Sequence, residues 1–226
     1  MKTKTHLPSY ESGLISLRSQ LKEALPGDLL QIFDNDAAHL EKNLSEGVRL
    51  KKGDIAPDFE LLNAAGEKVR LYEMLTHQRV VLVFYRGGWC PYCNLQLMLY
   101  QKVLPEFRAQ GAVLVAVSPE SPDNSMDTKE KNTLAFEVLS DPGNIVAKQY
   151  VEVFRNSERA IEAMASLGIN FYDFYTDSSG TLPVPAVFII EQSRRLSFAR
   201  SGGGDYRSRV EPEDILNVLK SDGDGK

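Results

Sequence analysis

The segment from residue 79 to residue 117 constrains the fold of this 226-residue chain more than any other part. It opens with RVVLVFY and closes with AVLVAV, two short apolar runs that are typical of buried strands. Between them, apolar residues at helical spacing run through NLQLMLYQKVLPEF. Two strands joined by one crossover helix are parallel, so the segment predicts a β–α–β unit in an α/β fold.

The chain's two cysteines, Cys90 and Cys93, lie where the first strand of this unit gives way to the helix. A helix N-terminus favours a thiolate, so we expect an exposed Cys90 sulfur with a lowered pKa. Cys93 follows one helical turn later. We expect its thiol to lie deeper and to act as the resolving thiol, which closes a disulfide with Cys90. Pro91 suits the first helical position, and Gly87–Gly88 permits a sharp turn that leaves the thiol open. The pattern indicates a redox pair rather than two inert cysteines.

Residues 1–50 show helical patterns and predict an N-terminal extension. The first helix ends at Pro26–Gly27, and the second has Asp28 as its N-cap and ends near Gly47. The first helix places its leucines on one side at Leu14, Leu17, Leu21 and Leu25. This apolar surface either packs on the main domain or forms a homodimer interface, and the sequence favours neither.

Residues 51–220 predict the main domain, and residues 221–226 predict a disordered tail. Shorter elements are expected as two strands around Gly66, a helix in 121–132, a strand at 136–139, helices at 142–150 and 158–167, an antiparallel strand pair at 185–190 and 196–200, and a helix at 211–219. Residues 142–182 form a helical and loop insertion. Its aromatic stretch, 169–181, is either a lid or a packed surface flap.

Composition excludes several function classes. A net charge of −5 argues against a nucleic-acid-binding surface. No apolar run approaches the ~20 residues that span a bilayer, and no secretory signal is evident, so we expect a cytoplasmic protein. Three scattered histidines and two cysteines predict no metal site and no cofactor.

The chain resembles the AhpC/TSA, peroxiredoxin-like branch of the thioredoxin-fold superfamily. The resemblance rests on GDIAPDFEL, VLVFYRGGWCPYCNLQL, VLVAVSPES, LSDPGN, VPAVFII and DYRSRVEPEDIL. It implies a mixed sheet flanked by helices, with Cys90 as the attacking and Cys93 as the resolving cysteine. It also implies that Val184 precedes a cis-proline, Pro185, which faces the pair.

The chain departs from the peroxiredoxin pattern at two positions before the attacking cysteine. Val83 and Gly87 stand where proline and threonine are usual, and the threonine hydroxyl normally helps hold the peroxide. The usual hairpin arginine falls at Ser197. One of three arginines is a candidate to substitute for it, Arg86, Arg195 or Arg200, and the sequence does not choose among them.

Three side chains beside the cysteines complete the candidate site. Arg86 either has a functional role, in which it stabilises the thiolate or orients a peroxide oxygen, or is a solvated loop arginine. Trp89 belongs to the substrate surface or to the core, and Tyr92 would set access to the pair.

The leading hypothesis is a thiol peroxidase that reduces hydrogen peroxide or organic hydroperoxides and is reset by a thioredoxin- or glutaredoxin-type donor. The alternative is a protein thiol–disulfide oxidoreductase, which Trp89, the CPYC quartet and Gly87 favour. A third is a non-catalytic module, either a dimeric scaffold or an iron–sulfur carrier with one cysteine from each subunit.

Overall fold

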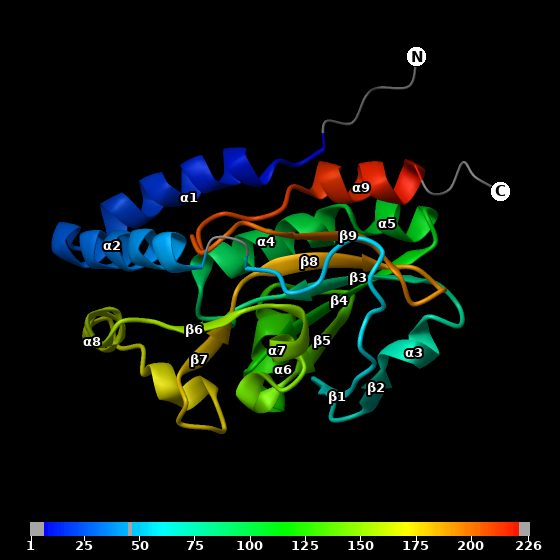
Figure 1. The fold of residues 1–226 in the computed structure, drawn as a ribbon. Coiled ribbons are helices and arrows are strands. Elements are labelled where there is room, and N and C mark those ends of the chain that lie inside the picture. The colour runs from blue at the N-terminus through cyan, green and yellow to red at the C-terminus, as the bar shows by residue number, and fades with distance from the viewer. Residues whose placement is uncertain (1–6, 45–46, 222–226) are drawn as a thin grey trace, which may run out of the picture.

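A mixed β-sheet organises the computed structural model, which describes residues 7–44 and 47–221 (Figure 1). Its strands are β1 (Glu60–Asn63), β2 (Lys68–Arg70), β3 (Arg79–Phe84), β4 (Ala112–Ser118), β5 (Glu137–Ser140), β8 (Ala186–Ile190) and β9 (Leu196–Ser201). They are ordered β2-β1-β5-β4-β3-β8-β9. Strands β3, β4 and β5 are parallel, and the remaining pairings are antiparallel.

The predicted β–α–β unit is confirmed. β3 pairs with β4 in parallel from Arg79↔Ala112 to Phe84↔Val117, and α4 (Pro91–Lys102) connects them together with α5 (Leu104–Ala109). Pro105 lies in the first turn of α5, so the expected break near this proline is also present. The unit places Cys90 at the carboxyl end of a central strand.

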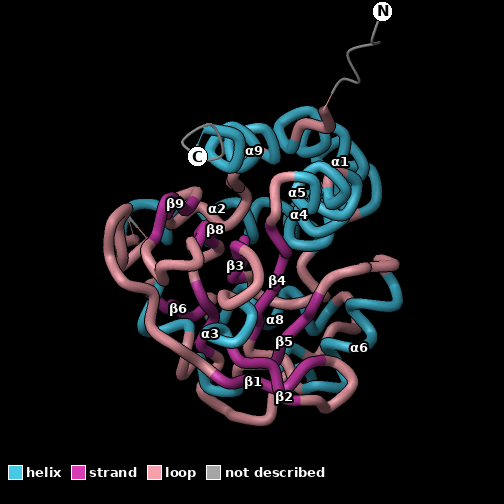
Figure 2. The backbone as a smooth tube through the Cα atoms, turned by 90° about the vertical axis from the view of Figure 1, so that its right-hand side faces the viewer, coloured by secondary structure: helices cyan, strands magenta, loops and turns pink. Residues whose placement is uncertain are grey.

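Two hydrophobic cores fill the two faces of the sheet, because successive strand residues point to opposite sides. Val81 and Val83 belong to the core that contains residues of α4, α5 and α9 (Pro212–Ser221). Val80 and Leu82 belong to the other core, under α3 (Leu71–Met74) and α7 (Ala147–Tyr150). α6 (Pro122–Lys131) lies beside β5. Figure 2 shows the helices on both sides of the sheet.

The N-terminal helices α1 (Tyr10–Ala24) and α2 (Gly27–Asn43) lie over the α4 side of the sheet (Figure 1). Leu14, Leu17 and Leu21 are partly buried and pack against the first core, so the chain itself covers part of the leucine stripe of α1. The predicted N-cap of α2 was wrong, because the helix starts at Gly27 and places Asp28 in its first turn. The helix ends at Asn43, before the expected end near Gly47. Residues 45–46 lie outside the described residues.

The segment between β5 and β8 contains more strand than its sequence suggested. Its elements are η1 (Pro142–Asn144), α7, β6 (Val153–Arg155), α8 (Glu158–Ser166), η2 (Phe171–Phe174) and β7 (Thr181–Pro183). The two three-residue strands β6 and β7 pair antiparallel, and neither is long enough to give a clear alternation. At the C-terminus, α9 includes Ser221, and residues 222–226 of the expected tail lie outside the described residues.

No helix in the described ranges is both long enough and apolar enough to cross a membrane.

Candidate active site

Cys90 caps the N-terminus of α4 in the loop that follows β3. Its carbonyl accepts the first helical hydrogen bonds, from the N–H groups of Cys93 and Asn94, both at 3.1 Å. Pro91 occupies the first turn, as predicted. Both cysteines are free thiols, and both are fully buried. The expected exposure of Cys90 is therefore wrong. Segments that are distant in sequence cover the loop of residues 85–90 between β3 and α4, which we call the active loop.

The two thiols influence each other's ionisation. Burial raises the pKa of Cys90, and its hydrogen bond to Cys93 raises it further. Burial opposes ionisation of Cys93 too, but the bond from Cys90 and the charges of Arg209 and Arg86 bring the Cys93 pKa well below its usual range. The predicted fall in the Cys90 pKa has the wrong sign. The two thiols therefore share one ionisation, in which the pKa of Cys93 is lowered and that of Cys90 is raised.

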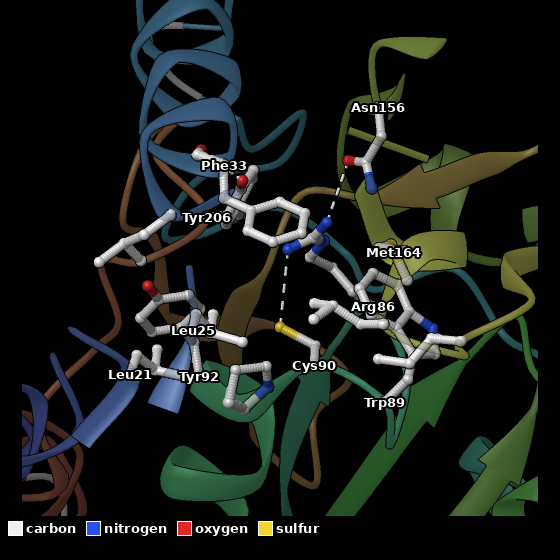
Figure 3. Close-up of a pocket in the computed structure, with 14 residues that line it drawn as sticks. Leu21, Leu25, Phe33, Arg86, Trp89, Cys90, Tyr92, Asn156, Met164 and Tyr206 are labelled. Carbon is white, nitrogen blue, oxygen red and sulfur yellow. Dashed lines mark hydrogen bonds between the residues drawn. The ribbon is translucent and has the colours of Figure 1, made fainter. Parts of the chain in front are cut away.

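Arg86 joins Cys90 to the segment between β5 and β8. Its Nη1 donates to the Cys90 Sγ at 3.6 Å, and its Nη2 donates to the Asn156 Oδ1 at 3.0 Å (Figure 3). The guanidinium lies 3.8 Å from the ring centre of Tyr206 and 4.7 Å from that of Trp89. Arg86 is 3% exposed, so the interpretation as a solvated loop arginine is wrong.

Arg209 contacts the second sulfur and was not anticipated. Its Nη2 donates to the Cys93 Sγ at 3.3 Å from the loop that precedes α9. The same guanidinium donates to the backbone carbonyls of Tyr206 and Ser208, which fixes its orientation. The motif DYRSRVEPEDIL contains Arg209, but nothing in that sequence indicates that it reaches a cysteine 116 positions away.

The glycines of the active loop allow close packing around a buried carboxyl group. Gly87 has φ of +152°, and a Cβ on Gly88 would come within 2.0 Å of the Thr128 Oγ1. The Gly88 N–H donates to the Glu120 Oε1 at 2.9 Å. Burial raises the pKa of Glu120 to about 8, against the effect of that hydrogen bond. Glu120 lies in the motif SPES but was not singled out by its sequence.

The aromatic segment covers the active loop rather than packing elsewhere on the surface. The Trp89 Nε1 donates to the Tyr175 hydroxyl at 2.7 Å, and that hydroxyl donates to the Arg86 carbonyl at 3.2 Å. Phe171 and Phe174 pack on the Trp89 ring at centroid distances of 5.6 and 6.4 Å. Of the two interpretations of residues 169–181, the covering one holds.

A cavity of about 240 Å³ opens beside the Cys90 side chain (Figure 3). Its polar lining includes Arg86, which contacts the sulfur, and Asn156, which accepts from Arg86. Much of the rest is apolar and comes from α1, α2 and the segment between β5 and β8, or from residues next to these helices, with Leu21, Leu25, Leu30, Phe33, Met164, Leu167 and Ile169. The site is therefore a thiol and a guanidinium at the base of an apolar chamber.

Tyr92 lines the cavity, whereas Val184 and Pro185 are placed differently from expectation. Tyr92 is buried, and its hydroxyl accepts from the Arg18 Nη1 at 3.2 Å, which connects the CPYC loop to α1. Val184 and Pro185 are both buried, but neither lines the cavity. The expected cis bond between them is wrong, because this peptide bond is trans.

The alternative arginines lie away from the thiols. Arg195 donates to the Gly53 carbonyl and Arg200 pairs with Asp214, both on the surface. Ser197, in the usual arginine position, donates to the Glu191 carboxylate at 2.6 Å. Of the three proposed substitutes, only Arg86 reaches the pair.

Known proteins share this architecture. The Peroxiredoxin Bcp of Escherichia coli K12 is 31% identical over 133 residues, which cover 59% of this chain and 83% of the relative. A putative peroxiredoxin of Helicobacter pylori J99 is 31% identical over 134 residues, 59% of this chain and 86% of its own length. Among solved structures, the peroxidoxin BcpB of Mycobacterium tuberculosis superposes with a TM-score of 0.60 at 22% identity, over 76% of this chain and 98% of that one. The model of the AhpC/TSA family matches residues 52–199, and the chain belongs to that family.

Proposed function

We propose that this protein is a thiol-dependent peroxidase in which Cys90 attacks the peroxide and Cys93 resolves the product. The observation that carries the proposal is the base of the cavity, where the Cys90 Sγ accepts a hydrogen bond from the buried Arg86 guanidinium. Cys93 does not line that cavity, so a peroxide that enters it meets Cys90. Arg86 is then in position to hold a peroxide oxygen and to stabilise charge on the leaving oxygen.

The hydrogen bond between the two sulfurs supplies the route for the first proton. Cys90 gives its proton to the Cys93 thiolate and attacks the peroxide as a thiolate. A sulfur–oxygen bond forms, the O–O bond breaks, and Cys90 becomes a sulfenic acid. The departing alkoxide or hydroxide takes the proton from Cys93, directly or through water, and leaves as an alcohol or water. Cys93 is then a thiolate again.

Cys93 then attacks the Cys90 sulfur. The S–S bond forms, the S–O bond breaks, and the oxygen leaves as water with a proton from solvent. An external dithiol of the thioredoxin or glutaredoxin type reduces the disulfide and is itself oxidised. We place this cycle in the cytoplasm, a reducing compartment that keeps such donors reduced.

The cavity favours organic hydroperoxides over hydrogen peroxide. Leu21, Leu25 and Phe33 present carbon surface to any substrate, and burial of apolar surface stabilises a complex by about 25 cal/mol per Å². Hydrogen peroxide has no apolar group that would use this surface.

Rapid mixing of the reduced protein with peroxide tests the proposal, with Trp89, the one tryptophan, as the fluorescent reporter. We expect reaction with an aryl or alkyl hydroperoxide at least about a hundredfold faster than that of free cysteine, and its loss in Cys90→Ser. Arg86→Lys keeps the positive charge but loses the planar guanidinium that donates to two partners at once. We expect its rate to lie between those of wild type and Cys90→Ser. An unchanged rate in Cys90→Ser would refute the assignment.

Thiol–disulfide exchange is a second candidate because Gly87 offers no hydroxyl where the family usually has threonine. In this reaction Cys90 attacks a substrate disulfide and Cys93 releases the product. Cys93→Ser would then accumulate mixed disulfides with protein partners in cells. A Cys93→Ser protein that traps no partner, but still forms a sulfenic acid with peroxide, separates the two functions in favour of the peroxidase.

The division between an N-terminal extension and the main domain near residue 50 is also proposed, and the start of the family match at residue 52 supports it. A homodimer through these helices is a narrower proposal, since their leucine stripe is already partly covered. Ile15 on α1 is 70% exposed and is the apolar residue available to a second copy. Sedimentation of wild type and Ile15→Glu would measure its contribution.

A further inference from the structure

The dithiol lies between two buried guanidinium groups, and each of them contacts one sulfur. Arg86 approaches Cys90 from the loop after β3, while Arg209 approaches Cys93 from the loop before α9. Arg209 is 9% exposed, and its residue number is outside the range that the family model matches. Its contact with Cys93, at 3.3 Å, is shorter than the 3.6 Å contact between Arg86 and Cys90.

Arg209 has no carboxylate to balance its charge within the described part of the chain. No ion pair joins it to an acidic side chain there, and its other acceptors are the neutral carbonyls of Tyr206 and Ser208. Its buried Nε has no hydrogen-bond partner. A buried cation without a counter-ion is costly, so this site favours a negative charge on the group that the guanidinium contacts. That group is the Cys93 sulfur.

We propose that Arg209 is a catalytic residue of the resolving step, where it holds Cys93 as the thiolate that attacks the oxidised Cys90. The inference rests on the proposed peroxidase function and gives Arg86 and Arg209 different roles. Arg86 contacts the sulfur of Cys90, which reacts with the substrate. Arg209 contacts the sulfur of Cys93, which closes the disulfide.

The step that Arg209 assists balances without any further redox partner. The Cys93 thiolate attacks the sulfur of the Cys90 sulfenic acid, and the new S–S bond replaces the S–O bond. The Cys90 sulfur is reduced from the sulfenic to the disulfide level, while the Cys93 sulfur is oxidised to the same level. The hydroxide that leaves takes a proton from solvent and becomes water.

The direct test measures the ionisation of Cys93 alone. Cys90→Ser leaves Cys93 as the sole cysteine of the chain, and thiolate absorbance in the ultraviolet follows its titration. In this background we expect Arg209→Met to move the titration up by about one pH unit or more, and Arg209→Lys to move it less. Arg200→Met, on the surface pair with Asp214, is the matched control and should leave it unchanged. A midpoint that is the same in all these proteins would overturn the proposal.

The kinetic test uses the wild-type cysteines. We expect Arg209→Met to form the Cys90 sulfenic acid, which a dione reagent traps. Disulfide closure should be roughly threefold to tenfold slower at a pH below the raised Cys93 pKa of this variant. A tenfold loss of thiolate is partly offset by the greater nucleophilicity of a more basic one. The slow step should recover as pH rises, which a merely structural defect would not do. Disulfide closure at the wild-type rate and pH profile would refute the role of Arg209.

Failure of the two proposals gives different results. If the protein is not a peroxidase, the wild type shows no fast reaction with peroxide, whereas the titration of Cys93 still depends on Arg209. If only the role of Arg209 is wrong, the fast reaction is present and the titration is insensitive to this residue. Arg209→Lys, which keeps the buried charge, protects the test against a Met variant that folds poorly, and thermal unfolding of each variant checks this.

Discussion

At the residue scale, Glu120 couples the stability of the active loop to pH. Burial raises the pKa of Glu120 from 4.5 to about 8, so between these values the native state keeps a proton that the unfolded chain releases. Stability should therefore fall as pH rises through this window, by up to about 1.4 kcal/mol per pH unit from this group. The contribution of a protonated Glu120 is complete below pH 4.5 and is lost above 8.

Urea unfolding of Glu120→Gln measures this contribution. Glutamine still offers an oxygen to the Gly88 N–H but never ionises, so we expect the variant to lose less stability than wild type between about pH 5 and pH 9. Glu130→Gln, on the exposed side of α6, is the matched control. Parallel stability curves for wild type and Glu120→Gln would contradict the expectation.

The sequence indicated those site residues that are neighbours in the chain. Arg86, Trp89, Cys90 and Cys93 fall within one strand-to-helix junction, so local geometry alone brings them together. Arg209 comes from a remote segment, and one sequence contains no information on which distant side chain will meet a given sulfur. The predicted direction of the Cys90 pKa shift was wrong for a similar reason. The helix N-terminus can be recognised in the sequence, but the burial that raises the pKa cannot.

At the scale of elements, α1 depends on a carboxylate at the other end of the chain. Glu211 accepts from the N–H groups of Tyr10 and Glu11 at 2.7 and 2.8 Å, two of the four N–H groups that a helix start leaves free. It therefore supplements the Ser9 cap and places a negative charge at the helix N-terminus. Glu211→Gln keeps one acceptor and loses the charge.

We expect Glu211→Gln to lower the free energy of unfolding by about 1 kcal/mol, because it weakens a charged cap on a helix terminus. Glu213→Gln, exposed in the first turn of α9, removes the same charge without touching α1 and serves as the control for exchange of the α1 amides. Hydrogen exchange of the first α1 amides should accelerate only in Glu211→Gln. Equal exchange in both variants would show that Ser9 alone caps the helix.

Most elements were predictable because their patterns are local. The strands β3 and β4 and the helix α4 have clear periods and clear ends, and all three were expected. The pair β6–β7 was missed because three residues cannot establish an alternation. The start of α2 was misplaced because Pro26 takes the cap position that Asp28 was expected to fill.

At the scale of the whole molecule, one cluster of charges joins the N-terminal helices to the rest of the fold. Asp34 of α2 binds Arg18 of α1 through both carboxylate oxygens at 2.7 Å and binds Arg207 of the C-terminal segment at 2.8 Å. Arg18 also donates to the Tyr92 hydroxyl inside the CPYC loop. The helices that roof the cavity are thus attached both to the segment that carries Arg209 and to the active loop.

Access to the buried thiols should follow the strength of this cluster. Both sulfurs are fully buried, so a bulky disulfide reagent reaches them only when α1 and α2 move away from the cavity. The labelling rate therefore reports the equilibrium between the closed and open states. Asp34→Asn leaves two guanidinium groups facing a neutral amide. Because these groups are partly exposed, the two ion pairs of Asp34 together stabilise the closed state by about 1–2 kcal/mol. We therefore expect labelling of Asp34→Asn to be roughly 5- to 30-fold faster than that of wild type. Asp28→Asn, exposed on the same helix, removes an equal charge and should label at the wild-type rate. If Asp34→Asn also labels at that rate, the thiols are reached by a motion that leaves α1 and α2 in place, and the cavity has another entrance.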